Sequence, residues 1–137
     1  MTEANRRENI REELERADRS LEAANILFDH AYYNEAVSRL YYHLLYLLRA
    51  LLLTKGLEPR SHEGASRLFA LHFVKTGAFP ADSSHSISKF MKFREEADYN
   101  PSYMFTSEDY RSLRQEAESL ASRVRAFLRQ EGYQWTE

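Results

Sequence analysis

The sequence predicts an all-α protein, an antiparallel up-and-down bundle of about five helices that forms one domain over residues 1–137. Four glycines and three prolines in 137 residues leave few places for turns, so the elements should be long. Apolar residues recur three and four positions apart along most of the chain, which is typical of amphipathic helices. Hydrophobic residues make up 43% of the chain and charged residues 29%, the usual balance in a globular protein.

The first predicted helix covers residues 3–29, and its apolar positions form one narrow stripe: Ile10, Leu14, Ala17, Leu21, Ala24 and Phe28. The second predicted helix covers residues 32–56 and is apolar almost all round between Leu40 and Leu53. Such a helix must be covered on several sides. We therefore expect a second copy of the chain to complete this cover, which makes the protein a homodimer.

The third predicted helix covers residues 62–74 and follows Ser61, whose side chain can cap a helix. The segment KTGAFPADSS then indicates a loop, because glycine and proline interrupt regular structure. We expect the fourth helix to begin after this loop, at Ser83 or Ser84.

The fourth predicted helix ends near Tyr99, because Pro101 pushes the residue before it away from helical geometry. The fifth begins at Thr106 or Ser107. The motif TSED places Asp109 three residues after Thr106, which is the spacing of a capping box.

The composition argues against several classes of protein. A net charge of −2 and a pI near 6.2 differ from the basic balance of general nucleic-acid binders, whose affinity comes from phosphate neutralisation. The absence of cysteine removes disulfides, thiol catalysis and cysteine-based zinc sites. The first residues lack the apolar core of a signal peptide, and the longest apolar stretch, residues 40–53, is too short to span a bilayer. We therefore expect a cytoplasmic protein with no membrane association.

The fourth predicted helix carries charged residues on its buried face. At about 100° per residue, Arg94 and Asp98 fall among Ile87, Phe90 and Ala97. A buried charge is costly unless it is paired, and these two residues are four positions apart, within reach of each other. One interpretation is a structural ion pair, which could lie across a dimer interface. The other is a cleft in which the pair holds a phosphate-bearing ligand, since the planar guanidinium suits phosphate.

His43 interrupts the apolar second helix. It can be a hydrogen-bonded core or interface residue, or it can contact a ligand. The five histidines include no pair three or four residues apart, and the chain has no Glu-x-x-His, the spacing by which helical bundles bind two irons. The sequence therefore predicts no metal and no cofactor.

Three segments resemble the HEPN domain family, and in particular its short, stand-alone prokaryotic branch. They are AYYNEAVSRLYYHLLYLLRALLLTKGLEPRSHEG, FVKTGAFP and FREEADYN. The resemblance implies an antiparallel helical bundle that commonly dimerises. It also implies a gene pair with a minimal nucleotidyltransferase, in which many pairs behave as toxin and antitoxin. Active members of the family are metal-independent ribonucleases that carry an arginine followed, after four to six residues, by a histidine.

The chain departs from this ribonuclease motif. Arg94 corresponds to the arginine, but Tyr99, Asn100 and Pro101 occupy the positions five to seven residues later. The imidazole that would move a proton near neutral pH is therefore missing from the motif. In related pairs the partner enzyme adds nucleotides to a tyrosine just beyond the motif, and the nearby candidates for such a modification are Tyr99 and Tyr103.

The resemblance thus implies a HEPN component of a toxin–antitoxin-like pair with a minimal nucleotidyltransferase. We expect it to bind a nucleotide or RNA through Arg94, Asp98 and Tyr99, with His43 as a further candidate. A first alternative is a divergent, metal-independent endoribonuclease, in which Arg94 and Asp98 would be the catalytic residues. A second alternative is a structural protein-interaction module.

Overall fold

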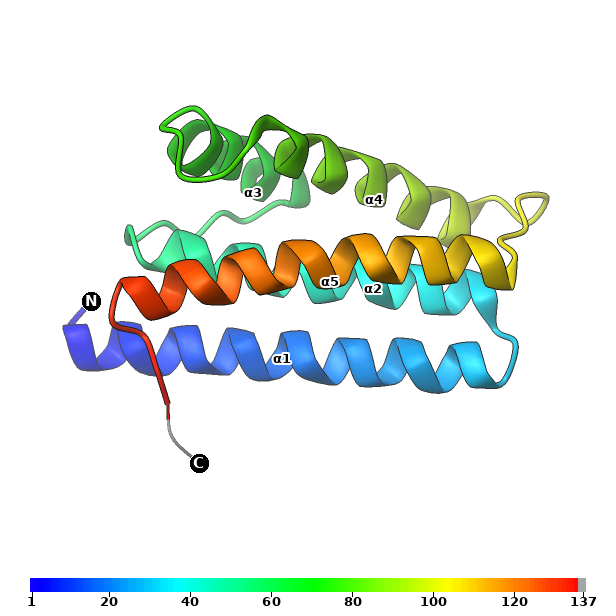
Figure 1. Cartoon of the computed structure of the whole chain (residues 1–137), viewed down its shortest axis with the longest axis horizontal. Helices are drawn as coiled ribbons and strands as arrows, with labels where there is room; N and C mark the ends of the chain where they lie inside the picture. The colour runs from blue at the N-terminus through cyan, green and yellow to red at the C-terminus, as the bar shows by residue number, and fades with distance from the viewer. Residues whose placement is uncertain (136–137) are drawn as a thin grey trace.

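The computed structural model describes residues 1–135, which form five α-helices and one short π-helical segment (Figure 1). The elements are α1 (Glu3–Asp29), α2 (Tyr33–Leu53), α3 (His62–Phe69), η1 (Ala70–Val74), α4 (Ala81–Tyr99) and α5 (Ser107–Gln130). These residues form no strand, which confirms the all-α prediction. In Figure 1, α1 and α4 run in one direction and α2 and α5 in the other, so the bundle is antiparallel.

Helix α2 lies at the centre of the bundle and packs against α1, α3, α4 and α5. Figure 1 shows α5 in front of it, α1 on one side, and α3 and α4 on the other. Fourteen of its 21 residues are buried, including every leucine from Leu40 to Leu53. One chain therefore covers α2 almost completely. Our reason for expecting a second copy, an uncovered apolar helix, no longer applies, and the homodimer stays a prediction.

Side-chain caps fix the predicted starts of α3 and α5. The hydroxyl of Ser61 accepts a hydrogen bond from the Gly64 amide at 2.9 Å. Thr106 and Asp109 form a complete capping box, in which each side chain accepts a hydrogen bond from the other residue's amide at 3.1 and 2.9 Å. The cap at Ser61 and the capping box are therefore both confirmed.

The predicted start of α4 was wrong by two or three residues. The helix begins at Ala81, before Ser83 and Ser84, and neither serine is its N-cap. Pro80 is the N-cap, and its extended backbone (φ −70°, ψ 158°) already leads into the first helical turn. The side chain of Ser83 is instead buried, and its hydroxyl has no hydrogen-bond partner.

The third predicted helix changes from α to π geometry after Phe69, which its periodicity did not indicate. The wider turn lies in a cluster of aromatic rings, Phe69, Phe73, Phe79 and Phe127, whose contacting centroids are 5.4 to 6.1 Å apart. Aromatic pairs of this kind add about 0.5–1.5 kcal/mol each. Their packing favours the wider turn and opposes the cost of its rarely used hydrogen-bond pattern.

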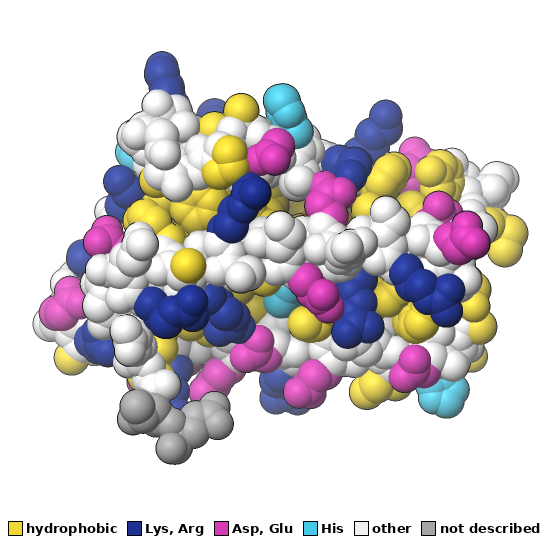
Figure 2. Space-filling view, viewed as in Figure 1, with side chains coloured by type: hydrophobic (Ala, Val, Ile, Leu, Met, Phe, Trp, Pro, Cys, Tyr) yellow, Lys and Arg dark blue, Asp and Glu magenta, His cyan; other side chains and the backbone are white. Residues whose placement is uncertain are grey.

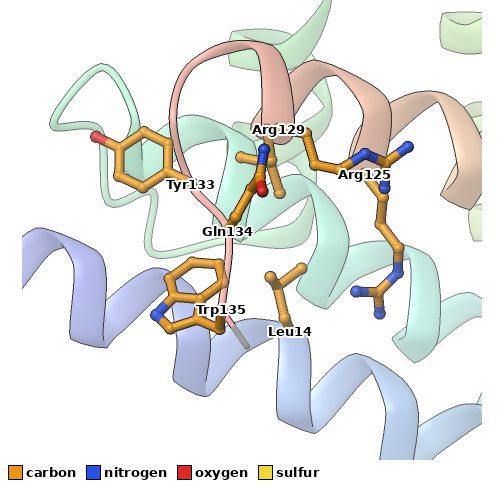
Figure 3. A pocket seen from close by; sticks show the side chains of 7 residues that line it. Leu14, Arg125, Arg129, Tyr133, Gln134 and Trp135 are labelled. Atoms are coloured by element: carbon orange, nitrogen blue, oxygen red, sulfur yellow. The ribbon is translucent and has the colours of Figure 1, made fainter. Parts of the chain in front are cut away.

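The segment that follows α5 packs against α1. Arg7 donates hydrogen bonds to the carbonyl oxygens of Gly132 (2.9 Å) and Gln134 (3.2 Å). Its guanidinium also lies 5.4 Å from the ring centroids of both Tyr133 and Trp135. Figure 3 shows this segment passing from α5 towards α1, beside a cavity of about 220 Å³. Arg7 thus fixes α5 against the first turns of α1.

Helices α1 and α5 end in the same hydrogen-bond motif, the Schellman motif, but with different residues. After α1, the Tyr32 amide donates to the Leu27 carbonyl at 2.8 Å and the Ala31 amide to the Phe28 carbonyl at 2.9 Å. The motif needs one residue in the left-handed region. Gly132 fills this position after α5 (φ 89°), whereas Ala31 fills it after α1 (φ 63°). A left-handed residue with a Cβ costs about 1–2 kcal/mol.

Replacing Ala31 with glycine is expected to raise the free energy of unfolding by up to about 1 kcal/mol, because the relief of left-handed strain exceeds the entropy that glycine adds to the unfolded chain. Urea unfolding measures this change. Ala23→Gly, inside α1, is the matched control and should lower stability by about 0.5–1 kcal/mol. An equal loss of stability in both variants would contradict the prediction.

Candidate functional site

Among the described residues, Arg94 is the only Lys, Arg, Asp or Glu that is buried, with 9% of its surface exposed. It lies on α4 on the same face as the buried Ile87 and Phe90, as the helical periodicity predicts. Its guanidinium carbon is 5.4 Å from the ring centroid of Tyr41 on α2 and 5.7 Å from that of Tyr99. Cation–π contacts of this kind contribute about 0.5–2 kcal/mol each, so the two rings stabilise a charge inside the bundle.

Asp98 satisfies little of the hydrogen-bonding capacity of Arg94. The distance from Nη1 of Arg94 to Oδ2 of Asp98 is 3.7 Å, too long for a good hydrogen bond. The Nε atom of Arg94 is buried and has no hydrogen-bond partner among the described residues. The sequence placed Asp98 inside the buried face, but the residue is exposed, because it lies in the last turn of α4. The guanidinium therefore keeps unused donors next to residues that solvent reaches.

The charge states in this region are well defined. Burial alone would lower the pKa of Arg94, but the oxygens of Tyr42, Tyr41 and Asp98 outweigh burial and raise it, so the guanidinium stays charged. Burial raises the pKa of Tyr41 to about 12, although Arg94 opposes this rise. The Tyr41 hydroxyl therefore keeps its proton and remains a hydrogen-bond donor.

His62, at the start of α3, is a neighbour that sequence reasoning did not connect with Arg94. Its ring centroid is 5.5 Å from that of Tyr41 and 5.8 Å from that of Tyr42. Burial lowers the pKa of His62, and the positive charges of Arg94 and Arg49 lower it further, so its imidazole is neutral at pH 7. The sequence showed that this histidine follows a helix cap, but it could not show which helix the ring faces.

Four residues of α2 form the only part of its length between Ala36 and Leu53 that is not buried. They are Arg39, Tyr42, Tyr46 and Arg49, three or four positions apart, and we call them the α2 stripe. The guanidinium of Arg39 lies 4.4 Å from the Tyr42 centroid, and that of Arg49 lies 5.8 Å from the Tyr46 centroid. The stripe consists of two tyrosines flanked by an arginine on each side, and it adjoins His62 through Tyr42.

The remaining sequence candidates lie in different surroundings. His43 is 2% exposed, and its Nδ1 lies 2.7 Å from the carbonyl oxygen of Ala17 on α1. The ring of Tyr103 packs on Phe105 at 4.8 Å. Tyr99, in contrast, contacts Arg94 and is 74% exposed. The structure therefore brings Arg94, Asp98 and Tyr99 together, while the contacts described for His43 and Tyr103 are to other residues.

Residues 10–129 match the model of the HEPN domain. The chain belongs to the HEPN family. Two relatives from Methanocaldococcus jannaschii are both named "Putative toxin". One is 37% identical over 124 residues, 90% of this chain and 92% of that protein, and the other is 32% identical over 115 residues, 84% and 78% respectively. A Thermotoga maritima relative named "UPF0332 protein" is 30% identical over 113 residues, 82% and 86% of the two chains.

In this HEPN chain the imidazole near Arg94 comes from α3 rather than from the residues that follow the arginine on α4. His62 and Arg94 face the same tyrosine, Tyr41, from two different helices. Spacing along the chain could not reveal this arrangement, because it depends on how α3 and α4 pack on α2.

The arginines of α5 are largely engaged with acidic residues. Arg114 pairs with Glu118 on its own helix at 2.9 Å, and Arg125 reaches Asp18 on α1 at 2.5 Å. Figure 2 shows Lys and Arg interspersed with Asp and Glu over this side of the molecule. Within residues 1–135 no group of three or more acidic, His or Cys side chains is placed to hold a metal, and no helix is long and apolar enough to cross a membrane.

Acid is expected to destabilise the fold through His43. Burial lowers the pKa of His43 below its ordinary 6.5, and nearby Arg125 acts in the same direction, although the Ala17 carbonyl, Asp18 and Glu118 oppose them. The unfolded chain therefore binds more protons as pH falls through about 6.5, so the stability present above that pH is lost below it. His62, whose pKa is also lowered, adds to this loss.

Urea unfolding at pH 7.5, 6.5 and 5.5 measures the effect. His43→Asn places an amide N–H close to the position of Nδ1, so it can still donate to the Ala17 carbonyl but does not titrate. The variant should therefore lose less stability over this range than the wild type. Identical pH dependence in the two proteins would show that His43 is not the responsible group.

Proposed function

We propose that this HEPN chain is one component of a cytoplasmic toxin–antitoxin-like module and that it binds the phosphate of a nucleotide or RNA at Arg94. The observation that carries the proposal is the buried guanidinium, which stays charged, has a free Nε donor and has only a long contact with Asp98. A phosphate oxygen would accept hydrogen bonds from Nε and Nη1 together, and such charge-assisted pairs are the strong ones.

The surroundings of Arg94 suit the other parts of a nucleotide. Tyr99 offers an exposed ring next to the guanidinium, and Tyr42 and Tyr46 of the α2 stripe offer two half-buried rings. Aromatic rings stack on bases with little regard to sequence, and cations beside them track the phosphates. Arg39 and Arg49 are the cations of the stripe. A short single strand would therefore find stacking and charge along α2.

The proposal of a toxin–antitoxin-like module rests on the family to which the chain belongs. Two relatives carry toxin in their names, which supports a toxin-like role for this chain. The proposed partner is a minimal nucleotidyltransferase, as the resemblance to the stand-alone prokaryotic branch implies. Its target for nucleotide addition would be Tyr99, which is far more exposed than Tyr103, at 74% against 37%. The homodimer belongs to the same proposal.

Arg94→Ala is expected to weaken the binding of single-stranded RNA at least about tenfold, because it removes hydrogen bonds to a charged group worth about 1.5–3 kcal/mol. Fluorescence anisotropy with a labelled oligonucleotide measures the Kd, and ATP should raise the Tm of the wild type more than that of the variant.

The matched control is Arg111→Ala, which removes another arginine that lies over an aromatic ring, 5.3 Å from the Phe28 centroid. Equal losses in both variants would mean that binding follows overall charge and not Arg94. A stable complex with a partner protein, together with no response to RNA or ATP, would favour the protein-interaction module.

A second candidate function, metal-independent RNA cleavage, is favoured by the position of His62. Its neutral imidazole would take the proton of a ribose 2′-hydroxyl as that oxygen attacks the phosphorus. The bond from phosphorus to the 5′-oxygen breaks, the leaving oxygen takes a proton from water, and a 2′,3′-cyclic phosphate forms. Arg94 would stabilise the charge that develops on the phosphate oxygens.

This second function predicts cleavage of RNA in the presence of EDTA and loss of that cleavage in both Arg94→Ala and His62→Asn. A falling rate as pH drops below the His62 pKa is expected, since the protonated ring is no base. His30→Asn, which changes an exposed histidine at the end of α1, is the control. If the protein binds RNA but leaves it intact even at high protein concentration, phosphate binding remains the function.

A further inference from the structure

A cavity of about 400 Å³ lies at the end of the α2 stripe, apart from the contacts of Arg94. Its walls come from α1, the last two turns of α2 and residues 57–60 of the following loop. This volume falls in the range of about 300–1,000 Å³ that small-molecule sites occupy.

Glu13 provides a carboxylate oxygen that no protein group uses. The side chain is 15% exposed and its Oε1 accepts a hydrogen bond from Arg16 at 3.2 Å. Its Oε2 is buried and has no hydrogen-bond partner within residues 1–135. Burial raises the pKa of Glu13, against the opposing charges of Arg16 and Arg49, as expected for a carboxylate that is incompletely hydrogen-bonded. A ligand with an N–H group would supply the missing donor.

The other residues that line the cavity are both charged and apolar. Arg49 on α2 and Arg60 on the loop line it from different segments. Leu53, Leu57 and Pro59 provide its apolar wall. The cavity is thus suited to a molecule with an anionic group, a flat or apolar body and a hydrogen-bond donor on that body.

The charges that line the cavity limit how much negative charge a bound anion can carry. Glu58 also lines the cavity, so two arginines face two glutamates. A triphosphate would bring more negative charge than the arginines can neutralise and would be repelled by both carboxylates. A single phosphate brings less negative charge and meets less repulsion, so it is favoured over a triphosphate.

We propose that this cavity binds a nucleoside monophosphate, with its phosphate between Arg49 and Arg60, its base against the apolar wall, and one base N–H donated to Glu13. The same chemistry occurs in a free nucleotide and in the phosphorylated end of an RNA strand. The site uses neither Arg94 nor Tyr99, so it goes beyond the function proposed above.

Titrations of ¹⁵N-labelled full-length protein test the proposal. AMP, CMP, GMP or UMP should shift the backbone amide signals of Leu53, Leu57 and Arg60. Inorganic phosphate and adenosine each contain only part of the ligand, so each should bind at least tenfold more weakly than the nucleoside monophosphates. Inorganic phosphate that binds as tightly as the nucleotides would overturn the proposal. An RNA hexanucleotide with a 5′-phosphate, compared with the same RNA bearing a 5′-hydroxyl, separates an RNA end from a free nucleotide as the source.

Two variants locate the ligand. Arg60→Ala changes an exposed residue and should weaken AMP binding tenfold or more, whereas Arg67→Ala, an exposed arginine of α3 outside the cavity, should leave it unchanged. Glu13→Leu replaces the carboxylate with an apolar side chain, removes the acceptor and should also weaken binding. Shifts confined to the α4 amides around Arg94 would overturn the cavity site while supporting the proposed function. Shifts at neither place would overturn both.

Discussion

The burial of α2 is the constraint on which the rest of the structure depends. Its leucines lose most of their stabilising effect unless neighbours exclude water from them, and each fully buried leucine contributes about 1.5–3 kcal/mol. Helices α1, α3, α4 and α5 supply that cover from within the chain. What they leave uncovered is the α2 stripe, Arg39, Tyr42, Tyr46 and Arg49. The fold thus produces a narrow cationic and aromatic surface because it buries every other residue of α2 between Ala36 and Leu53.

The same packing determines the surroundings of Arg94, for which we propose anion binding. Contact between α4 and α2 removes the guanidinium from bulk water, and the rings of Tyr41 and Tyr99 replace part of its hydration. Because Asp98 lies in the last turn of the helix, it reaches only one nitrogen, at 3.7 Å. The bundle therefore holds a cation in place while leaving its hydrogen bonds incomplete. Groups in this condition bind anions without first breaking a strong internal pair.

The sequence alone predicted the structure correctly where the geometry of a single helix determines where a residue lies. Periodicity placed Arg94 on the buried face of its helix, and the TSED motif located the start of α5. The prediction failed where the packing of two helices, or a local feature of the backbone, determines where a residue lies. Asp98 has the right periodicity, but it lies too near the helix end to be buried. Ser83 had the chemistry of a cap, but Pro80 starts the helix first. His62 meets Tyr41 only after α3 has packed on α2.

The position of Arg49 has a thermodynamic consequence. This one cation lines the cavity beside Glu13 and also acts electrostatically on Tyr41 and His62. An anion bound to Arg49 would neutralise a charge that disfavours protonated His62, so it would make that imidazole more basic. By linkage, a proton on His62 would in turn strengthen the hold of Arg49 on the anion. The proposed cavity site and His62 would therefore be heterotropically coupled through one shared guanidinium, without any movement of the helices between them.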